Sequence, residues 1–153
     1  MVNSELISSF IKKPIFPNVD KGSLNTGISL IEVIFPNTSS FQFDKVTFSN
    51  AYTAFISIKF KFKNSQDEWK TVLDDLPLMQ NIHMETGSQD DFTITKRQLL
   101  NFSDEVIAAR LILKQPSPLW SHFDIDNVHF YQVNKKVVAH LSSKISGHRR
   151  IFN

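Results

Sequence analysis

The stretch Asp124-Ile125-Asp126 contains two acids at a spacing that could bind a metal ion. In an extended segment alternate side chains share a face, so the two carboxylates would lie side by side. Carboxylate oxygens are ligands that hard cations such as Ca²⁺ prefer. Alternatively, the two acids form the solvent face of a strand whose Ile125 points inward. We favour this second interpretation and predict no metal site.

Other reactive residue types occur without the spacing that known sites require. Asp74-Asp75 and Asp90-Asp91 are adjacent pairs, which in extended backbone point to opposite faces and so do not resemble a glycosidase pair. The chain has no G-x-S-x-G motif and no glycine cluster for a phosphate. The histidines are seven or more residues apart, with no His-x-His or His-x-x-x-His pair; they are His83, His122, His129, His140 and His148. We predict no catalytic residue, no cofactor and no enzyme activity.

The composition indicates one globular domain rich in β-structure. The chain has 153 residues, 41% hydrophobic and 21% charged, and its 14 phenylalanines favour half-buried strands over helices. No cysteine is present, which excludes disulfides, thiolate zinc sites and cysteine nucleophiles. A net charge of +2 is too balanced to predict nucleic-acid binding. We find neither a signal peptide nor a membrane-length apolar run, and expect a soluble, intracellular protein.

Short alternating segments separated by turn signals predict about eight strands and hence a β-sandwich or barrel. A change of alternation phase at Asp44-Lys45 predicts a bulge. Residues 4–11 place apolar side chains on one helical face after a potential Ser4 cap, which predicts a short helix. The predicted strands include residues 28–35, 41–50, 53–63, 68–76, 92–95, 107–114 and 128–133.

Residues 53–63 give the clearest strand, with one buried face and one wet face. The residues predicted to point inward are Ala54, Ile56, Ile58, Phe60 and Phe62. Lys59, Lys61 and Lys63 alternate with them and are predicted to point outward. We interpret them as edge lysines that prevent strand-to-strand aggregation; the alternative is a surface for an acidic partner.

The stretch 109–120 joins a strand to a Pro-Ser-Pro-Leu-Trp corner. Arg110 has apolar neighbours, so we expect it to pair with an Asp or Glu of an adjacent strand. Pro116 and Pro118 stiffen the corner. Trp120 either caps the core or serves as a platform for a sugar or a partner peptide, and we favour the core cap.

The last twenty residues form a basic, amphipathic tail. Lys144, Arg149 and Arg150 belong to a stretch without acids, and Leu141 and Ile145 are spaced four apart. The tail is either a docking helix for a partner groove or a segment that packs back onto the sandwich, and the sequence does not decide between them. We divide the chain into an N-terminal segment 1–27, a β-sandwich 28–133 and the tail 134–153.

Residues 109–132 resemble the closing hairpin of discoidin-like, galactose-binding-like jelly rolls, with an Arg-bearing strand, a Trp-containing loop and a strand that has Tyr131 near its end. The resemblance implies that the strands on the two sides of the proline corner form a hairpin. Together with residues 46–60 this block is similar to the nicolin family, whose members are subunits of the tubulin polyglutamylase complex. The resemblance covers about forty positions closely and 28–132 more weakly. Vertebrate nicolins continue with a longer C-terminal region, so contacts made by that extension are not expected here.

The resemblance implies a jelly-roll scaffold without catalytic residues, since glutamate addition in that complex belongs to a tubulin-tyrosine-ligase-like enzyme. It implies protein partners within a tubulin-modifying assembly, indirect contact with tubulin or microtubules, no membrane, and a location in the cytoplasm, cytoskeleton, cilium or basal body. The alternatives are a structural microtubule protein and a carbohydrate-binding module. Candidate partner-binding residues are Pro116, Pro118, Trp120, Lys144, Arg149 and Arg150.

Overall fold

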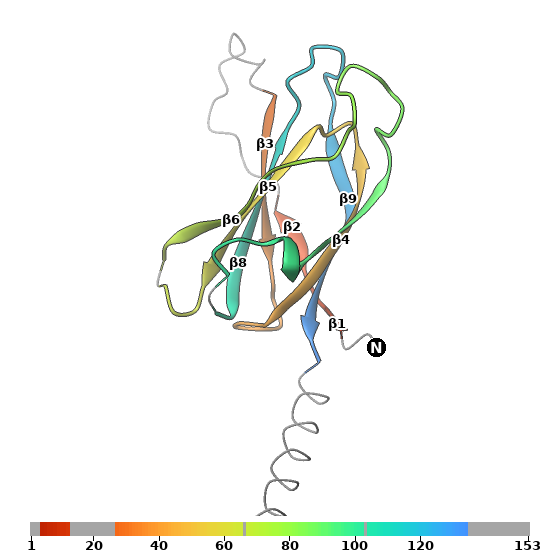
Figure 1. Ribbon diagram of the computed structural model, residues 1–153. Coiled ribbons are helices and arrows are strands. Elements are labelled where there is room, and N and C mark those ends of the chain that lie inside the picture. Colours follow the sequence, from red (N-terminus) through yellow and green to blue (C-terminus); the bar gives the residue numbers. More distant parts are fainter. Residues whose placement is uncertain (1–3, 13–26, 66, 103, 135–153) are drawn as a thin grey trace, which may run out of the picture.

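The fold is a sandwich of two antiparallel sheets, which confirms the predicted all-β jelly-roll class (Figure 1). The computed structural model describes residues 4–12, 27–65, 67–102 and 104–134. In the order in which the strands lie side by side, one sheet consists of β1 (Ser4–Ile7), β9 (Asp124–Val133), β4 (Phe43–Ala51) and β7 (Asp91–Thr95). The other consists of β2 (Phe10–Lys12), β3 (Ile28–Ile34), β8 (Val106–Lys114), β5 (Phe55–Phe62) and β6 (Trp69–Pro77). A short 3-10 helix, η2 (Lys96–Gln98), follows β7, and no helix among the described residues is long and apolar enough to span a membrane.

Phenylalanines from both sheets interlock in the core. Phe43 on β4 and Phe60 on β5 belong to opposite sheets, and their ring centroids are 5.2 Å apart. Phe130 on β9 meets Phe43 at 6.1 Å and Phe35 at 5.1 Å, both edge to face. Such aromatic pairs stabilise beyond the area they bury, by about 0.5 to 1.5 kcal/mol each. Phenylalanine side chains therefore hold the two sheets together.

The alternation in residues 53–63 is confirmed, but the strand is not at an edge. All five residues predicted to face inward are buried. However, β5 lies between β8 and β6, so the interpretation of Lys59 and Lys61 as edge lysines is wrong. Alternation reports which face a residue lies on, whereas the position of a strand within its sheet depends on partners far away in the sequence.

The predicted helix at residues 4–11 is wrong, because this segment forms β1 and β2. β1 pairs with β9 and β2 pairs with β3, so backbone groups that a helix would bond internally are bonded to the sheets. Ser4 donates its hydroxyl hydrogen bond to the Asp44 carboxylate on β4 instead of capping a helix. Leu6 and Phe10, which a helix would bury together, are exposed.

Two further local predictions are corrected and one is confirmed. The carboxylates of Asp74 and Asp75 do not point apart, since both approach the Ser57 hydroxyl, at 3.4 and 3.2 Å. The cause is a register irregularity in the β5–β6 pair and the left-handed conformation of Asp75, whose φ is +47°. The strands on either side of the proline corner, β8 and β9, lie in different sheets and do not form a hairpin.

The predicted bulge at Asp44-Lys45 is present as a register shift between Phe43 and Lys45 in the pairing of β4 with β9.

Ion pairs connect strands on the outside of the five-stranded sheet, one between the neighbours β8 and β3 and one across β5 between β8 and β6. Arg110 on β8 donates two hydrogen bonds, of 2.9 and 3.1 Å, to Glu32 on β3, which confirms the predicted pairing. Lys114 donates a hydrogen bond to Asp75, at 2.7 Å, and this bond lowers the pKa of the Asp75 carboxyl. A lowered folded-state pKa stabilises the fold above the carboxyl's ordinary pKa, and this stabilisation is lost as the pH falls through the folded value.

Replacement of Phe130 by Ala should strongly destabilise the protein. The ring is fully buried and contacts phenylalanines of both β4 and the segment after β3, so its loss leaves a cavity between the sheets. We expect a loss of about 3 to 5 kcal/mol of unfolding free energy, measured by urea denaturation. Leu6→Ala, at an exposed position, should change it by less than about 0.5 kcal/mol. Similar effects of the two substitutions would contradict the central role of the aromatic packing.

Candidate functional site

The turn between β4 and β5 holds Tyr52 in a strained conformation at one end of the sandwich. Its φ is +65°, a left-handed value that is rare for a bulky side chain. The buried Asn50 side chain bonds Thr53 in both directions, donating to its carbonyl at 2.9 Å and accepting from its amide at 3.1 Å. The Tyr52 amide donates to the Ser88 carbonyl at 2.8 Å. Such strain persists only where surrounding contacts fix it, and it occurs preferentially at functional sites.

Gln115 joins this turn to the proline corner from inside the protein. Its buried side-chain amide donates to the Tyr52 carbonyl, and its side-chain oxygen accepts the Ser117 amide at 2.9 Å. Its backbone amide donates to the carbonyl of Gly27 at 2.7 Å. A buried amide satisfied in this way fixes the relative positions of three chain segments.

The proline corner is bonded to a neighbouring loop, in part through Trp120. The Trp120 ring nitrogen donates to the Ile82 carbonyl at 2.6 Å, and its ring lies 4.7 Å from the Tyr52 ring, tilted by 32°. The Tyr52 hydroxyl in turn donates to Glu85 at 2.8 Å. Trp120 is half-buried, so it is neither a core cap nor a free platform. It clamps the corner against the 78–90 loop.

A hydroxyl–imidazole pair, Ser117 and His83, also joins the proline corner to the 78–90 loop. The Nδ1 of His83 lies 3.1 Å from the Ser117 hydroxyl, which also accepts the Leu119 amide at 3.3 Å. A nucleophilic serine needs an accessible oxygen and a base oriented by a third group. Ser117 is buried, and among the described residues no carboxylate bonds His83. The pair therefore has the geometry of a structural link between loops.

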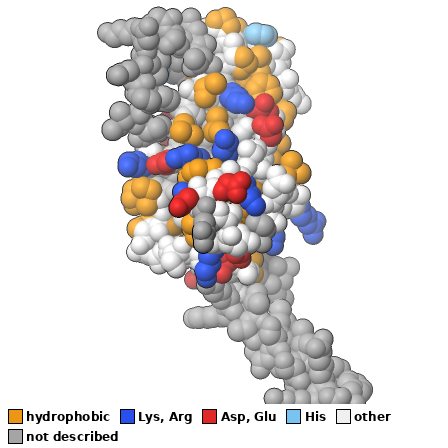
Figure 2. Space-filling model, turned by 90° about the vertical axis from the view of Figure 1, so that its left-hand side faces the viewer, with side chains coloured by type: hydrophobic (Ala, Val, Ile, Leu, Met, Phe, Trp, Pro, Cys, Tyr) orange, Lys and Arg blue, Asp and Glu red, His pale blue; other side chains and the backbone are white. Residues whose placement is uncertain are grey.

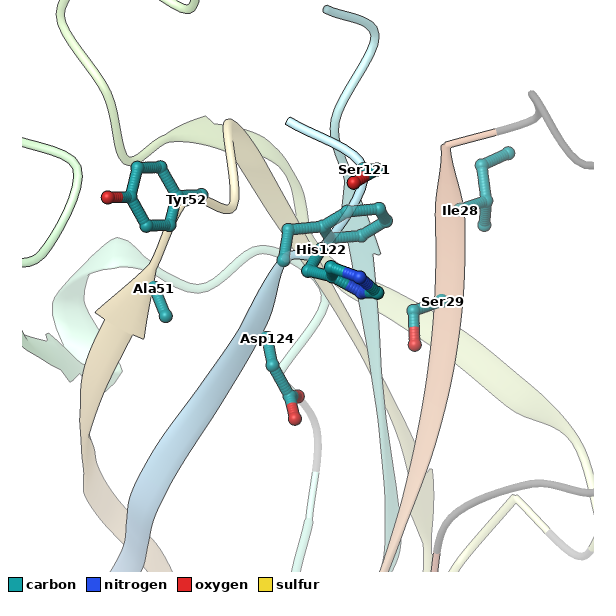
Figure 3. A pocket seen from close by; sticks show the side chains of 8 residues that line it. Ile28, Ser29, Ala51, Tyr52, Ser121, His122 and Asp124 are labelled. Carbon is teal, nitrogen blue, oxygen red and sulfur yellow. The ribbon is translucent and has the colours of Figure 1, made fainter. Parts of the chain in front are cut away.

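Two open cavities flank the corner at this end of the molecule. The first, of about 570 Å³, lies between the ends of β3 and β9, where Ser29, His122 and Asp124 project into it (Figure 3). The second, of about 540 Å³, lies beside Pro116 and Trp120. Both cavities share Ser121 and Phe123, so the residues after Trp120 form the wall between them.

The acids of β9 do not assemble a metal site in the described part of the chain. Ile125 is buried, which confirms that it points inward between Asp124 and Asp126. Each carboxylate accepts the amide of the following residue at 2.8 Å. Within the described ranges no three His, Asp or Glu side chains gather at metal-binding distances.

The loop end, which we define as the 51–53 turn, the 78–90 loop and the 115–123 corner, thus presents a fixed surface with apolar tips. Leu119 is 61% exposed and Met84 is 54% exposed, and Pro116 and Pro118 are exposed beside them. The structure brings together Pro116, Pro118 and Trp120 of the predicted partner-binding residues. Lys144, Arg149 and Arg150 lie outside the described residues. Sequence reasoning weighed His83 only as a possible metal ligand and did not single out Tyr52 or Gln115. The Asn50-Ala-Tyr-Thr composition gives a turn signal for Tyr52, and no local signal marks Gln115.

Gly27→Ala should loosen the loop end. Gly27 has a φ of +56°, and an added Cβ would lie 2.1 Å from the Gln115 carbonyl oxygen, which cannot move without disturbing the corner. We expect a loss of at least about 1 to 3 kcal/mol of unfolding free energy, measured by urea denaturation. Gly87→Ala is the matched control, because Gly87 has a φ of +78° and an added Cβ there would lie 3.7 Å from the Asp90 carboxylate, an ordinary contact distance. Equal losses would show that backbone strain alone, and not the contact with Gln115, matters at Gly27.

Comparisons with known proteins agree with this fold. No family model matches the chain. The chain is 39% identical over 113 residues to Nicolin-1 of Mus musculus, which amounts to 72% of this chain and 53% of the mouse protein. The chain thus spans about half the length of this relative.

Two solved structures share the architecture. One is a chain in the crystal structure of reduced XRCC1 bound to the DNA pol beta catalytic domain, with a TM-score of 0.54 and 17% identity over 69% of this chain and 76% of that one. The other is the solution structure of the N-terminal domain of the single-strand break repair protein XRCC1, with a TM-score of 0.52 and 10% identity over 71% and 74%. At such identities these likenesses establish the fold alone. Over the part that it shares with Nicolin-1, the chain is a homologue of that protein and belongs to the nicolin family.

Proposed function

We propose that the chain is a non-catalytic adaptor subunit that docks onto partner proteins of a tubulin polyglutamylase assembly through its loop end. The observation that carries this proposal is the rigid presentation of exposed apolar side chains, with Leu119 and Met84 held by the bonds of Trp120, Tyr52 and Ser117. A surface that is already ordered loses little conformational freedom when it binds.

The family and the fold support docking of proteins. Members of the nicolin family, as the sequence resemblance implies, are subunits of an assembly whose glutamate-adding chemistry belongs to another chain. In one solved structure of similar fold, XRCC1 is bound to the DNA pol beta catalytic domain. The proposed location follows from the proposed partners and is the cytoplasm and cytoskeleton, including the cilium or basal body.

A carbohydrate-binding module is the second candidate. The cavity between β3 and β9 combines an aromatic wall, Tyr52 and Phe123, with the polar side chains of Ser29, His122 and Asp124 (Figure 3). Aromatic faces beside polar groups suit sugars, and the volume of about 570 Å³ is that of a small-ligand site. Binding on a glycan array, lost in Phe123→Ala and without protein partners, would favour this candidate.

Leu119→Asp should remove the chain from its assembly without unfolding it. Affinity purification of the tagged wild-type chain should recover a tubulin-tyrosine-ligase-like enzyme with companion subunits. Since Leu119 is exposed at the proposed contact, a charge there should reduce recovery about tenfold, as expected on loss of an interface hot spot. Removal of residues 134–153 tests the tail separately.

The matched control is Leu100→Asp, because Leu100 is also 61% exposed and lies away from the loop end, beside Val72 of β6. It should leave recovery unchanged. Absence of the ligase-like enzyme from the wild-type purification would reject the assembly, and equal recovery with Leu119→Asp would reject the loop end as the contact.

A further inference from the structure

The outer face of the five-stranded sheet carries a band of charges that crosses four strands. In register from strand to strand, Lys12 faces Glu32, Glu32 faces Arg110, and Arg110 faces Lys59. These side chains point outward because their chain neighbours on β3, β8 and β5 are buried. Across the sheet the band therefore consists of a cation, an anion and two cations, in the order Lys12, Glu32, Arg110 and Lys59.

Large apolar and aromatic side chains flank this band. Phe10 and Ile34 face each other on β2 and β3, and Lys61 and Trp69 face each other on β5 and β6. Phe10 is 51% exposed, and Ile34 and Trp69 are half-exposed. Figure 2, which views the molecule from the β6 side of Figure 1, shows hydrophobic side chains with positive and negative side chains between them.

The outer face of the four-stranded sheet is different. There two outward residues of β4 each lie between outward residues of the neighbouring strands β7 and β9. Lys45 lies between Thr95 and Tyr131, and Thr47 lies between Thr93 and His129. A sheet that faces water on one side ordinarily carries polar residues there, as these three strands do, while on β1 the apolar Leu6, opposite Tyr131, is 55% exposed on the same face. The mixture of Phe, Ile and Trp on the other sheet is instead typical of a surface that a partner covers.

Trp69 and Arg110 are held in place on this face. The Arg110 guanidinium lies 4.1 Å from the centre of the Trp69 ring, and its nitrogens bond Glu32 on the other side. Lys61 contacts the same ring, with its ammonium 4.8 Å from the centre. Trp and Arg are the residue types enriched among binding hot spots, and pre-ordering lowers the cost of binding.

The charges of this face are incompletely balanced within the described chain. Glu32 is bonded to Arg110 and Asp75 to Lys114, whereas Lys61 has only Asp67 at 3.9 Å, whose side chain is 99% exposed. Lys59 forms no ion pair with any described residue. It lies directly opposite Arg110, and like charges at opposed positions destabilise a sheet. An external anion at this point would relieve the repulsion.

We propose that this face is a second docking surface, which binds an acidic segment of a partner protein. A carboxylate of the segment lies between Lys59 and Arg110 beside Trp69, and apolar side chains of the segment pack on Phe10 and Ile34. Charge complementarity identifies the occupant, because the one anion of the band as defined, Glu32, is already bonded to Arg110, while Lys59 forms no ion pair with any described residue. The proposal does not depend on the identity of the assembly or on the loop end.

Selection of random displayed peptides on the full chain tests the chemistry of the occupant. We expect enriched peptides to carry at least two acidic residues with an apolar residue between or beside them. Binding of a selected peptide, followed by fluorescence anisotropy, should weaken about tenfold in Lys59→Glu and in Lys61→Glu, since a cation becomes an anion at the contact. It should also weaken as salt is raised.

Lys45→Glu is the matched control, because Lys45 on the four-stranded sheet lies 4.8 Å from the centre of the Tyr131 ring, as Lys61 does from that of Trp69. It should leave binding unchanged, and thermal melting establishes that all three variants fold. Failure to enrich acidic peptides would overturn the proposal, and so would binding by Lys59→Glu and Lys61→Glu that is as tight as binding by the wild type. Self-association of the chain that these two substitutions abolish would also overturn it, since a second copy would then be the occupant. Leu119 is untouched in every variant, so the outcome is independent of the loop-end test.

Discussion

The structure depends on close packing of phenylalanine rings across the two sheets. Phe43 and Phe60 meet from opposite sheets, and Phe130 links that contact to Phe35 and Phe41. Because interiors are packed to crystal-like density, these rings fix the separation of the sheets. The loop end begins at the opposite ends of β4 and β9, where Ala51 lies beside Asp124. It is held there by its own hydrogen bonds, which Asn50, Gln115 and Trp120 make.

The sequence predicted the faces of the strands better than their neighbours. Alternation identified Ile56, Ile58 and Phe60 as core because a two-residue period is a local property of the chain. It did not reveal that β5 is an interior strand, since its neighbours β6 and β8 are specified by contacts from elsewhere in the sequence. The same reason explains the failed helix at residues 4–11, where pairing with β9 and β3 overrides a local helical pattern.

The candidate site was only partly predictable. A stiff corner could be predicted from Pro116, Pro118 and Trp120, because proline restricts the backbone at its own position in the chain. The residues that position this corner act across long separations. Gln115 reaches Tyr52, 63 positions earlier, and His83 reaches Ser117, 34 positions later. No local signal distinguishes a glutamine that will bond a distant backbone carbonyl from one that faces water.

The loop end and the outer face of the five-stranded sheet are ordered by different kinds of contact. The loop end gains its shape from a buried, satisfied amide and a strained turn, so its apolar tips are presented by bonds that lie beneath them. The outer face of the five-stranded sheet has no such support, and its order comes from the aromatic and ionic contacts of Trp69, Arg110 and Glu32 on the surface itself. Exposed ion pairs contribute little stability on their own, whereas the same pairs gain strength once a partner excludes water from them. A face of this kind is therefore better suited to binding than to holding the fold together, while the fold itself is held by the rings within.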